Sequence, residues 1–170
     1  MIVKIISTVL DNTYTTDDLI ERLGLMRLYY GKRIFSKGKE ITIDDVLGTE
    51  CEPHTLTALK QWERGFETAN IQPLVVYEAL DTVQEEVAGM PSVVLYVPVR
   101  FTGEHVTRLG TWFRTHVQPN ILLTLRVDPR AAGGCSLIWK HTYYDFSLHY
   151  FIQRNRDAIV SRFNEHIHAE

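Results

Sequence analysis

Residues 121–127 read ILLTLRV, and this stretch has the clearest alternation of apolar and polar side chains in the sequence. In an extended backbone, successive side chains point to opposite sides. One side would then carry Ile121, Leu123, Leu125 and Val127. The other side would carry Thr124 and Arg126, and this division is typical of a strand with one side buried. We therefore predict a half-buried β-strand here.

The residues that follow this strand are turn formers. Pro129 presets a turn dihedral, and the Asp128 carboxylate can accept bonds from neighbouring backbone N–H groups. Gly133 and Gly134 can adopt the positive φ that a tight turn or a bulge needs. Residues 135–140, CSLIWK, have the apolar and aromatic content of a second strand. The two strands are predicted to pair as an antiparallel hairpin.

Further elements on both sides of this hairpin complete a small sheet domain. Residues 92–100, SVVLYVPVR, favour a strand, and residues 102–117 favour a helix that Pro119 ends. A long amphipathic helix follows the hairpin, with Asp145 and Ser147 at N-cap positions. Its apolar side carries Leu148, Phe151, Ile152, Ile159 and Phe163. The predicted order is strand, helix, strand, strand, helix.

The first ninety or so residues favour helices only. Residues 15–35 have helical apolar spacing behind an N-cap threonine, and Thr42 can cap a short helical turn. Pro53 suits the first turn of a further helix. Residues 73–88 carry another apolar stripe, which Gly89 ends. This part of the chain has room for three or four helices.

Length and composition indicate a globular chain. With 170 residues, of which 45% are apolar, the chain can bury a core in one domain or in two small ones. We predict an α+β fold with a helical region at residues 1–90 and an α/β domain at residues 91–170. In the second domain, a βαββ sheet is closed by a long C-terminal helix.

Charge and cysteine content limit the partners and the compartment. Lys and Arg number 18 against 21 Asp and Glu, so the chain has no basic field that attracts nucleic acid. Cys51 and Cys135 have no metal-ligand spacing, which suits reduced thiols in the cytoplasm. The apolar start MIVKIISTVL lacks a basic leader, and Asp11 interrupts it before a membrane span. We expect a cytoplasmic protein without membrane insertion of its own.

The spacing of reactive residues gives no support to catalysis. The seven histidines form no HExxH motif, and no G-x-S-x-G elbow is present. Neither cysteine is joined to a histidine by a local motif. We expect no catalytic residue, no cofactor, no metal and no small-molecule substrate. A small hydrolase whose His and Asp meet only in the fold stays an alternative, and it requires a concave pocket with perturbed titratable groups.

One succession of motifs resembles a known family. Val127-Asp128-Pro129 is followed by Gly133-Gly134, by a strand, and by the run YDFSL at residues 144–148. This pattern is similar to the C-terminal signature of the delta subunit, or oligomycin-sensitivity-conferring protein, of F-type ATP synthases. In that family a strand ending in V-D-P leads to a Gly-Gly pair, a strand and a D-x-S-L step into a closing helix. The resemblance covers roughly residues 90–160.

The resemblance implies a function and partners. It implies a non-catalytic peripheral-stalk subunit that links the catalytic head to the b-subunit stalk. The expected partners are the alpha subunit of the head and the b subunit, and the location is the cytoplasmic side of the membrane, reached through these partners. The α/β domain would hold the end of a b-subunit helix, and the helical region would face the head.

The sequence departs from the family at both ends. The family's N-terminal six-helix bundle opens with a Y-A-x-A-L type helix, which nothing in this sequence matches. Because this helix is missing from the sequence pattern, the implied contacts with the head are in doubt. Residues 154–170 also prolong the last helix beyond the family's usual end.

A cluster of aromatic and arginine residues is the candidate interaction surface, because these residue types concentrate binding energy at protein interfaces. We predict that Tyr144, Tyr150, Phe151, Arg154 and Arg156 bind the partner. The same residues could form an aromatic and basic platform for nucleic acid, which the overall charge disfavours. A standalone soluble α+β adaptor that binds proteins is the alternative function, since a shared arrangement of elements does not secure a role.

Overall fold

The computed structural model describes residues 2–36, 40–49, 51–131 and 133–167. The chain forms two compact units. Unit 1 consists of Met1–Pro91 and Gly103–Leu122, and unit 2 of Ser92–Thr102 and Leu123–Glu170. The first change of unit lies beside the expected boundary at about residue 90. The predicted α/β domain includes residues 103–122, however, and the structure groups these residues with the helices of unit 1.

The fold contains helices and a four-stranded mixed sheet, which confirms the predicted α+β class. The helices of unit 1 are α1 (Ile2–Asp11), α2 (Thr16–Phe35), α3 (Ile43–Leu47), α4 (Pro53–Thr68), α5 (Pro73–Ala88) and α6 (Gly103–His116). The described part of the first ninety residues therefore has five helices, and the prediction of three or four is wrong. The missed helix is α1, which buries Ile5, Val9 and Leu10 and exposes Val3.

Local capping explains where several of these helices begin. The Thr15 hydroxyl accepts a hydrogen bond from the Asp18 N–H at 3.1 Å. Thr42 and Asp45 form a reciprocal capping box at α3, and the bonds from Thr42 lower the pKa of the Asp45 carboxyl. Pro53 and Pro73 occupy the first turns of α4 and α5. These starts confirm the predicted helices.

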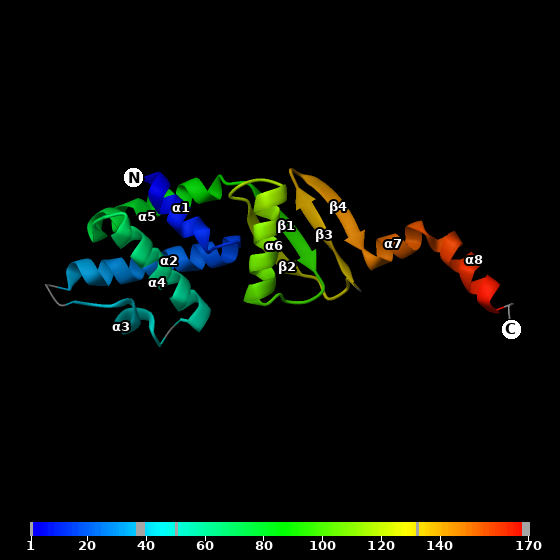
Figure 1. The fold of residues 1–170 in the computed structure, drawn as a ribbon, viewed down its shortest axis with the longest axis horizontal. Coiled ribbons are helices and arrows are strands. Elements are labelled where there is room, and N and C mark those ends of the chain that lie inside the picture. The colour runs from blue at the N-terminus through cyan, green and yellow to red at the C-terminus, as the bar shows by residue number, and fades with distance from the viewer. Residues whose placement is uncertain (1, 37–39, 50, 132, 168–170) are drawn as a thin grey trace. The chain divides into compact units, whose positions relative to one another are not determined.

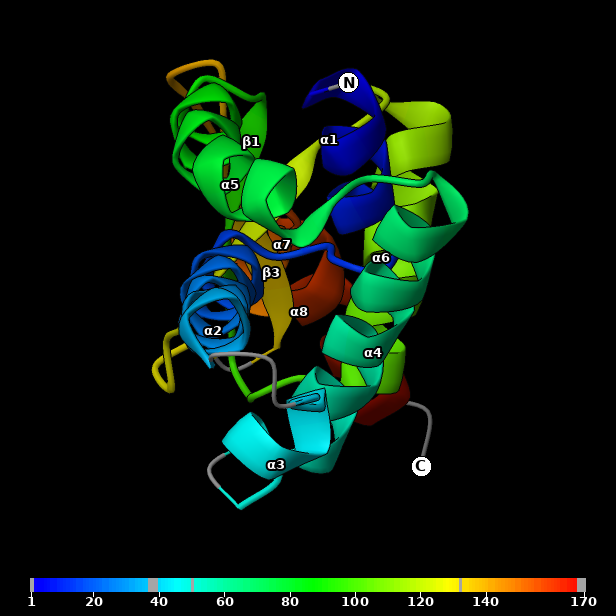
Figure 2. The same cartoon turned by 90° about the vertical axis from the view of Figure 1, so that its left-hand side faces the viewer.

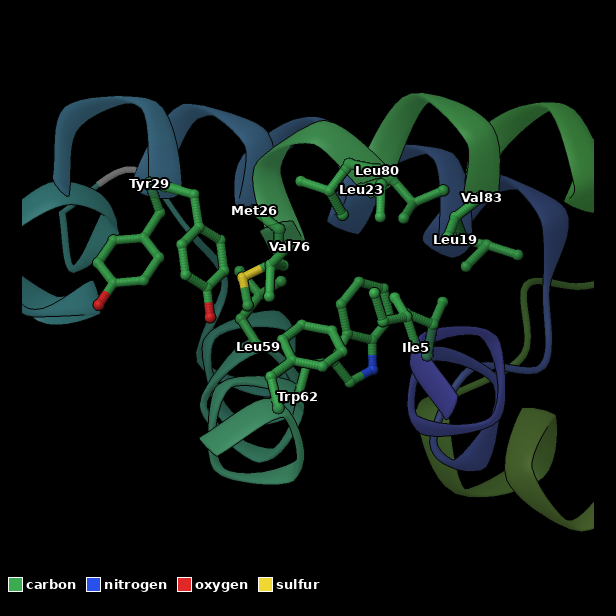
Figure 3. Packing of buried hydrophobic residues seen from close by; sticks show 14 of the residues in the cluster. Ile5, Leu19, Leu23, Met26, Tyr29, Leu59, Trp62, Val76, Leu80 and Val83 are labelled. Atoms are coloured by element: carbon green, nitrogen blue, oxygen red, sulfur yellow. The ribbon is translucent and has the colours of Figure 1, made fainter. Parts of the chain in front are cut away.

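The core of unit 1 lies between α1, α2, α4 and α5 (Figure 3). Trp62 and Phe66 are fully buried, and Tyr29 and Tyr30 almost so. The Tyr30 ring lies 6.5 Å from that of Phe66, a separation typical of aromatic pairs. Burying one large side chain of this kind contributes about 1.5–3 kcal/mol to folding. Unit 1 thus has a closed hydrophobic core of its own.

Two arginines fix the turn between α1 and α2 and join α6 to it. Arg22 Nη1 donates to the Asn12 carbonyl and to the Thr13 hydroxyl, both at 2.8 Å. Arg114 of α6 donates to the Leu10 and Thr13 carbonyls, both at 2.6 Å. Burial lowers the pKa of both guanidinium groups, yet the negative end of the α1 dipole favours their charge. Figure 2 shows α6 beside α1, the helix to which Arg114 bonds.

Unit 2 is built on the sheet (Figure 1), whose strands are β1 (Ser92–Val97), β2 (Leu122–Val127), β3 (Gly134–Trp139) and β4 (Thr142–Ser147). Their order is β2-β1-β3-β4, and β3 pairs antiparallel with both β1 and β4. Because the sheet is mixed, β1 and β2 are its parallel pair, as a connection through a helix allows.

The predicted hairpin between residues 121–127 and 135–140 is wrong. β1 lies between β2 and β3, and the hairpin of this sheet joins β3 to β4 through Lys140 and His141, whose φ angles are 48° and 64°. Such a turn usually contains Asn-Gly or Asp-Gly, and Lys-His does not predict it. The prediction of two strands after the helix therefore omits β4. The alternation predicted for residues 121–127 also fails at its ends, since Leu122 is buried and Val127 is 45% exposed.

The predicted long final helix is two helices, α7 (Leu148–Arg154) and α8 (Arg156–Ile167), separated at Asn155. Ser147 caps α7 by accepting the Tyr150 N–H at 3.2 Å, as predicted. Asp145 does not cap the helix. It lies in β4, and its carboxylate accepts the Ser147 N–H at 2.8 Å.

Candidate partner-binding groove

One face of the sheet changes from buried to exposed between its middle and its β4 edge. Leu95, Leu137 and Tyr144 are successive cross-strand partners and therefore lie on the same face. Leu95 is 3% exposed, Leu137 is partly buried, and Tyr144 is 42% exposed. Phe146, two residues further along β4, is 61% exposed. The β4 side of this apolar face is thus open to solvent.

A groove of about 950 Å³ lies along β4 and α7. We call it the aromatic groove. Its lining residues are Tyr143, Tyr144, Asp145, Phe146, Ser147, Tyr150, Phe151, Arg154 and Asn155. The Tyr144 and Phe146 rings are nearly parallel, with centroids 6.5 Å apart and 6° between their planes, so they stack next to each other along the strand. Contiguous exposed apolar surface of this kind marks interaction sites in soluble proteins.

The connection from β3 and β4 into α7 gives the groove its shape. Gly134 has a φ of 75°, and a Cβ atom there would lie 2.3 Å from the Phe146 carbonyl oxygen. Only glycine fits this position. The neighbouring Gly133 carbonyl accepts the Leu148 N–H at 3.0 Å, so the end of β4 and the first residue of α7 are held to the β3 side. Glycine at this site therefore permits the close approach that places α7 beside the strand.

The polar groups of the groove include one acid and one base. Hydrogen bonds from Ser147, first its hydroxyl and then its backbone N–H, lower the pKa of the Asp145 carboxyl, so Asp145 stays ionised. Arg154 lies at the α7 end. Unit 2 as a whole has seven Lys and Arg against five Asp and Glu, whereas unit 1 has eleven against sixteen. The groove thus belongs to the basic unit of an acidic chain.

The structure brings together four of the five predicted binding residues. Tyr144, Tyr150, Phe151 and Arg154 line the groove. Arg156 does not line it, because the chain breaks at Asn155 and Arg156 begins α8. The predicted cluster also included Tyr143, which lines the groove, but it omitted Phe146 because the strand β4 was not recognised.

The other predicted turn residues have structural contacts. Asp128 Oδ1 accepts the Arg130 N–H at 3.1 Å, and the bonds from Arg130 lower the pKa of the Asp128 carboxyl. Ala131 N–H in turn bonds the Asp128 carbonyl at 3.1 Å, which closes the turn after Pro129. This carboxylate therefore stabilises a turn, as predicted.

A second, shallower groove of about 540 Å³ lies on unit 1. Its lining residues are Gly24, Arg27, Leu28, Gly31, Lys32, Phe35 and Tyr77. Ile20, Leu28 and Phe35 share one side of α2 at helical spacing, and their exposed fractions are 58%, 41% and 77%. The two glycines leave room for a close neighbour, and a Cβ atom on Gly24 would meet nothing within 4 Å. We call this the α2 groove.

The groups in these grooves suit contact better than acid–base chemistry. In the described part of the chain, no three His, Cys, Asp or Glu side chains lie close enough to hold a metal ion. The aromatic groove contains a single carboxyl, Asp145, and its lowered pKa makes it a weak base. Burial raises the pKa of the Cys135 thiol, which makes a nucleophilic thiolate less accessible. None of the described helices has the length and apolar content needed to cross a membrane.

No family model and no curated protein matches the sequence. The resemblance to the delta subunit family stays a prediction from the residue pattern of the β2 to α7 region. That region contains the aromatic groove, so the pattern and the candidate site coincide.

Proposed function

We propose that this protein is a non-catalytic peripheral-stalk subunit of an F-type ATP synthase, in which unit 2 holds a helix of the b subunit. The observation that carries the proposal is the aromatic groove. It combines five aromatic side chains on β4 and α7 with an arginine at one end. Such a surface fits the apolar side of an amphipathic helix, which binds through side chains spaced three, four and seven residues apart.

The energetics of the groove agree with a binding role. Phe146 and Phe151 are each 61% exposed, so each retains most of its apolar surface for a partner. Covering the surface that one of them still exposes is worth roughly 1–2 kcal/mol in transfer free energy. A few such anchors dominate the affinity of a typical protein interface. The tyrosine hydroxyls and Arg154 would then fix the orientation of the helix at the rim.

Unit 1 would meet the head of the synthase. The surface best suited to this contact is the α2 groove, where Leu28 and Phe35 are exposed beside the basic Arg27 and Lys32. Arg27 forms an ion pair with Asp81 of α5. Lys32 is the second basic group that lines the groove. An amphipathic helix of the alpha subunit with acidic flanks would fit this surface.

The second candidate is a standalone α+β adaptor that binds another protein through the same groove. The groove itself favours this candidate as well, because its apolar and aromatic lining would accept an amphipathic helix from many proteins. The two candidates differ in the identity of the partner. The decisive observation is therefore which protein occupies the groove.

The test is an affinity purification of the tagged protein from its native membranes, followed by mass spectrometry. Recovery of the alpha, beta and b subunits is the expected result. A matched pair of variants makes the result specific: Phe146→Thr removes an aromatic anchor, and Val99→Thr changes a side chain that is 60% exposed outside the groove. Loss of the b subunit with the first variant only would support the proposal. Recovery of unrelated soluble proteins, or of none, would oppose it and favour the adaptor.

A further inference from the structure

Helix α8 has almost no tertiary support within unit 2. From Arg156 to Glu165 every side chain is exposed except Ile159, which is partly buried. Val160 is 49% and Phe163 66% exposed. Figure 1 shows α7 leading from the end of β4 to α8, and of the described elements of unit 2 only α7 packs substantially against it. The helix is therefore held at one end only.

A helix of this length and composition is marginal in water. α8 has twelve residues, and isolated helices shorter than about 12–15 residues are only partly formed even when rich in alanine. α8 contains one alanine, Ala158, followed directly by the β-branched Ile159 and Val160. β-branched residues lower helix propensity because they lose side-chain freedom. α8 thus needs its apolar residues to be covered before it is stable.

We infer that α8 becomes a stable helix only when the helix bound in the aromatic groove extends along it, so that folding of α8 is coupled to partner binding. This inference rests on the proposed function. The occupant is an amphipathic helix of the partner with acidic residues at its flanks. Coupled folding of this kind extends a binding surface, and part of the interaction free energy offsets the entropy that the segment loses when it becomes ordered.

The position of α8 relative to the groove is the first argument for this occupant. Arg154 and Asn155 line the α7 end of the groove, and the next residue, Arg156, begins α8. A helix leaving the groove at this end would meet α8 without a gap. The Asn155 side chain donates to the Phe151 carbonyl and ends α7, so α8 begins as a separate helix directly beyond the groove.

The charges along this segment also favour a partner with acidic residues. Arg154, Arg156 and Arg162 supply three positive charges along this segment, against Asp157 and Glu165. Arg154 and Arg156 flank the junction at which the partner would pass from the groove to α8. Acidic residues on the partner would neutralise them and fix the direction in which it lies. The partner would also need a helix long enough to follow α8, whose length is about 18 Å at 1.5 Å per residue.

Hydrogen exchange of the full chain tests the inference, with a synthetic peptide of the C-terminal helix of the b subunit encoded in the same genome as the probe. In the free protein, the α8 amides should exchange within about tenfold of the coil rate, and the α4 amides should be protected. With saturating peptide, exchange in α8 should slow by at least about a hundredfold. Vesicles of anionic lipid are added in a separate arm.

Two variants separate this inference from the proposed function. Val160→Pro breaks the helix in the middle of α8 and should weaken peptide binding about tenfold while leaving the groove intact. Val160→Ala removes most of the apolar side chain but raises the helix propensity, and as the matched control it should lose less affinity than Val160→Pro. Phe146→Thr reports on the groove, and loss of binding with it is evidence for the proposed function alone.

Each other outcome contradicts the inference in a distinct way. Protection of α8 in the free chain would mean that the helix is stable without a partner. Peptide binding that leaves α8 unprotected, with wild-type affinity for Val160→Pro, would overturn the inference and leave the proposed function standing. Failure of the peptide to bind would overturn both. Protection of α8 by vesicles and not by the peptide would assign this segment to a membrane surface instead.

Discussion

The core of unit 1 and the aromatic groove of unit 2 differ in how far their aromatic side chains are exposed. In unit 1, Trp62 and Phe66 have no exposed surface. In unit 2, Phe146 and Phe151 are each 61% exposed. Each unit has nine Phe, Trp and Tyr residues, and in unit 1 several of them close the core. The buried aromatic residues of the unit 1 core thus serve stability, whereas those of the aromatic groove are available for binding. The same kind of substitution should therefore have different consequences in the core and in the groove.

The largest effect is expected at Trp62. Replacing a fully buried tryptophan with alanine leaves a cavity between α2, α4 and α5, and Trp62→Ala should lower the free energy of unfolding by about 3–5 kcal/mol. Trp62→Phe should cost less, because the indole N–H has no hydrogen-bond partner within the described residues and phenylalanine keeps much of the ring volume. Denaturant unfolding followed by circular dichroism measures both. Equal losses for the two variants would show that ring volume is not the cause.

Gly134 should have the next largest effect. Alanine there would need a positive φ of 75° and would place its Cβ atom 2.3 Å from the Phe146 carbonyl oxygen. Gly134→Ala should therefore destabilise unit 2 by about 1–3 kcal/mol. Gly133→Ala is the matched control, because its Cβ atom would make only an ordinary contact with Leu148 at 3.7 Å. Thermal unfolding of both variants and the wild type measures the difference. A lower stability of Gly133→Ala than of Gly134→Ala would contradict this explanation.

A smaller effect on stability is expected at Phe146, although phenylalanine is as large as most core residues. Because most of its surface is already exposed, Phe146→Thr should change the free energy of unfolding by no more than about 0.5 kcal/mol. Threonine also suits a strand. This near-neutral result, set beside the loss expected for Trp62→Ala, would sharpen the contrast between the two units. A loss comparable to that of Trp62→Ala would remove it.

The smallest effect is expected from pH at Asp145. Bonds from Ser147 lower its pKa in the folded state, so its stabilising contribution is present above the ordinary pKa of about 3.9. The contribution is lost as the pH falls through the lowered folded-state pKa. The stability difference between the wild type and Asp145→Asn should therefore shrink between neutral pH and strongly acidic pH. Unfolding series at several pH values measure it, and a difference that grows on acidification would have the wrong sign.

The sequence predicted what depends on local chemistry. Thr15, Thr42 and Ser147 are caps in the structure, because a hydroxyl at this position accepts a hydrogen bond from a free N–H group in the first turn of the helix. Apolar spacing predicted α2, α4, α5 and α6 for the same local reason, whereas α1 was missed. The assignment of Asp145 as a cap failed because the strand it occupies was not recognised.

The sheet could not be predicted in the same way. Which strand β3 joins depends on contacts between distant residues, and the Lys140–His141 turn lacks the usual turn residues. The aromatic groove depends on that pairing, since it exists only when Tyr144 and Phe146 stand side by side on β4. Four residues of the predicted surface nevertheless line the groove, because aromatic and arginine residues outside a core are informative in themselves.

The most direct test of the central claim is a calorimetric titration of the full chain with the C-terminal helix of the b subunit from the same genome. The account predicts binding by the wild type and by Val99→Thr, and a loss of at least about tenfold in affinity for Phe146→Thr. Absence of binding by the wild type, or equal binding by all three proteins, would contradict the claim that the aromatic groove holds the stalk.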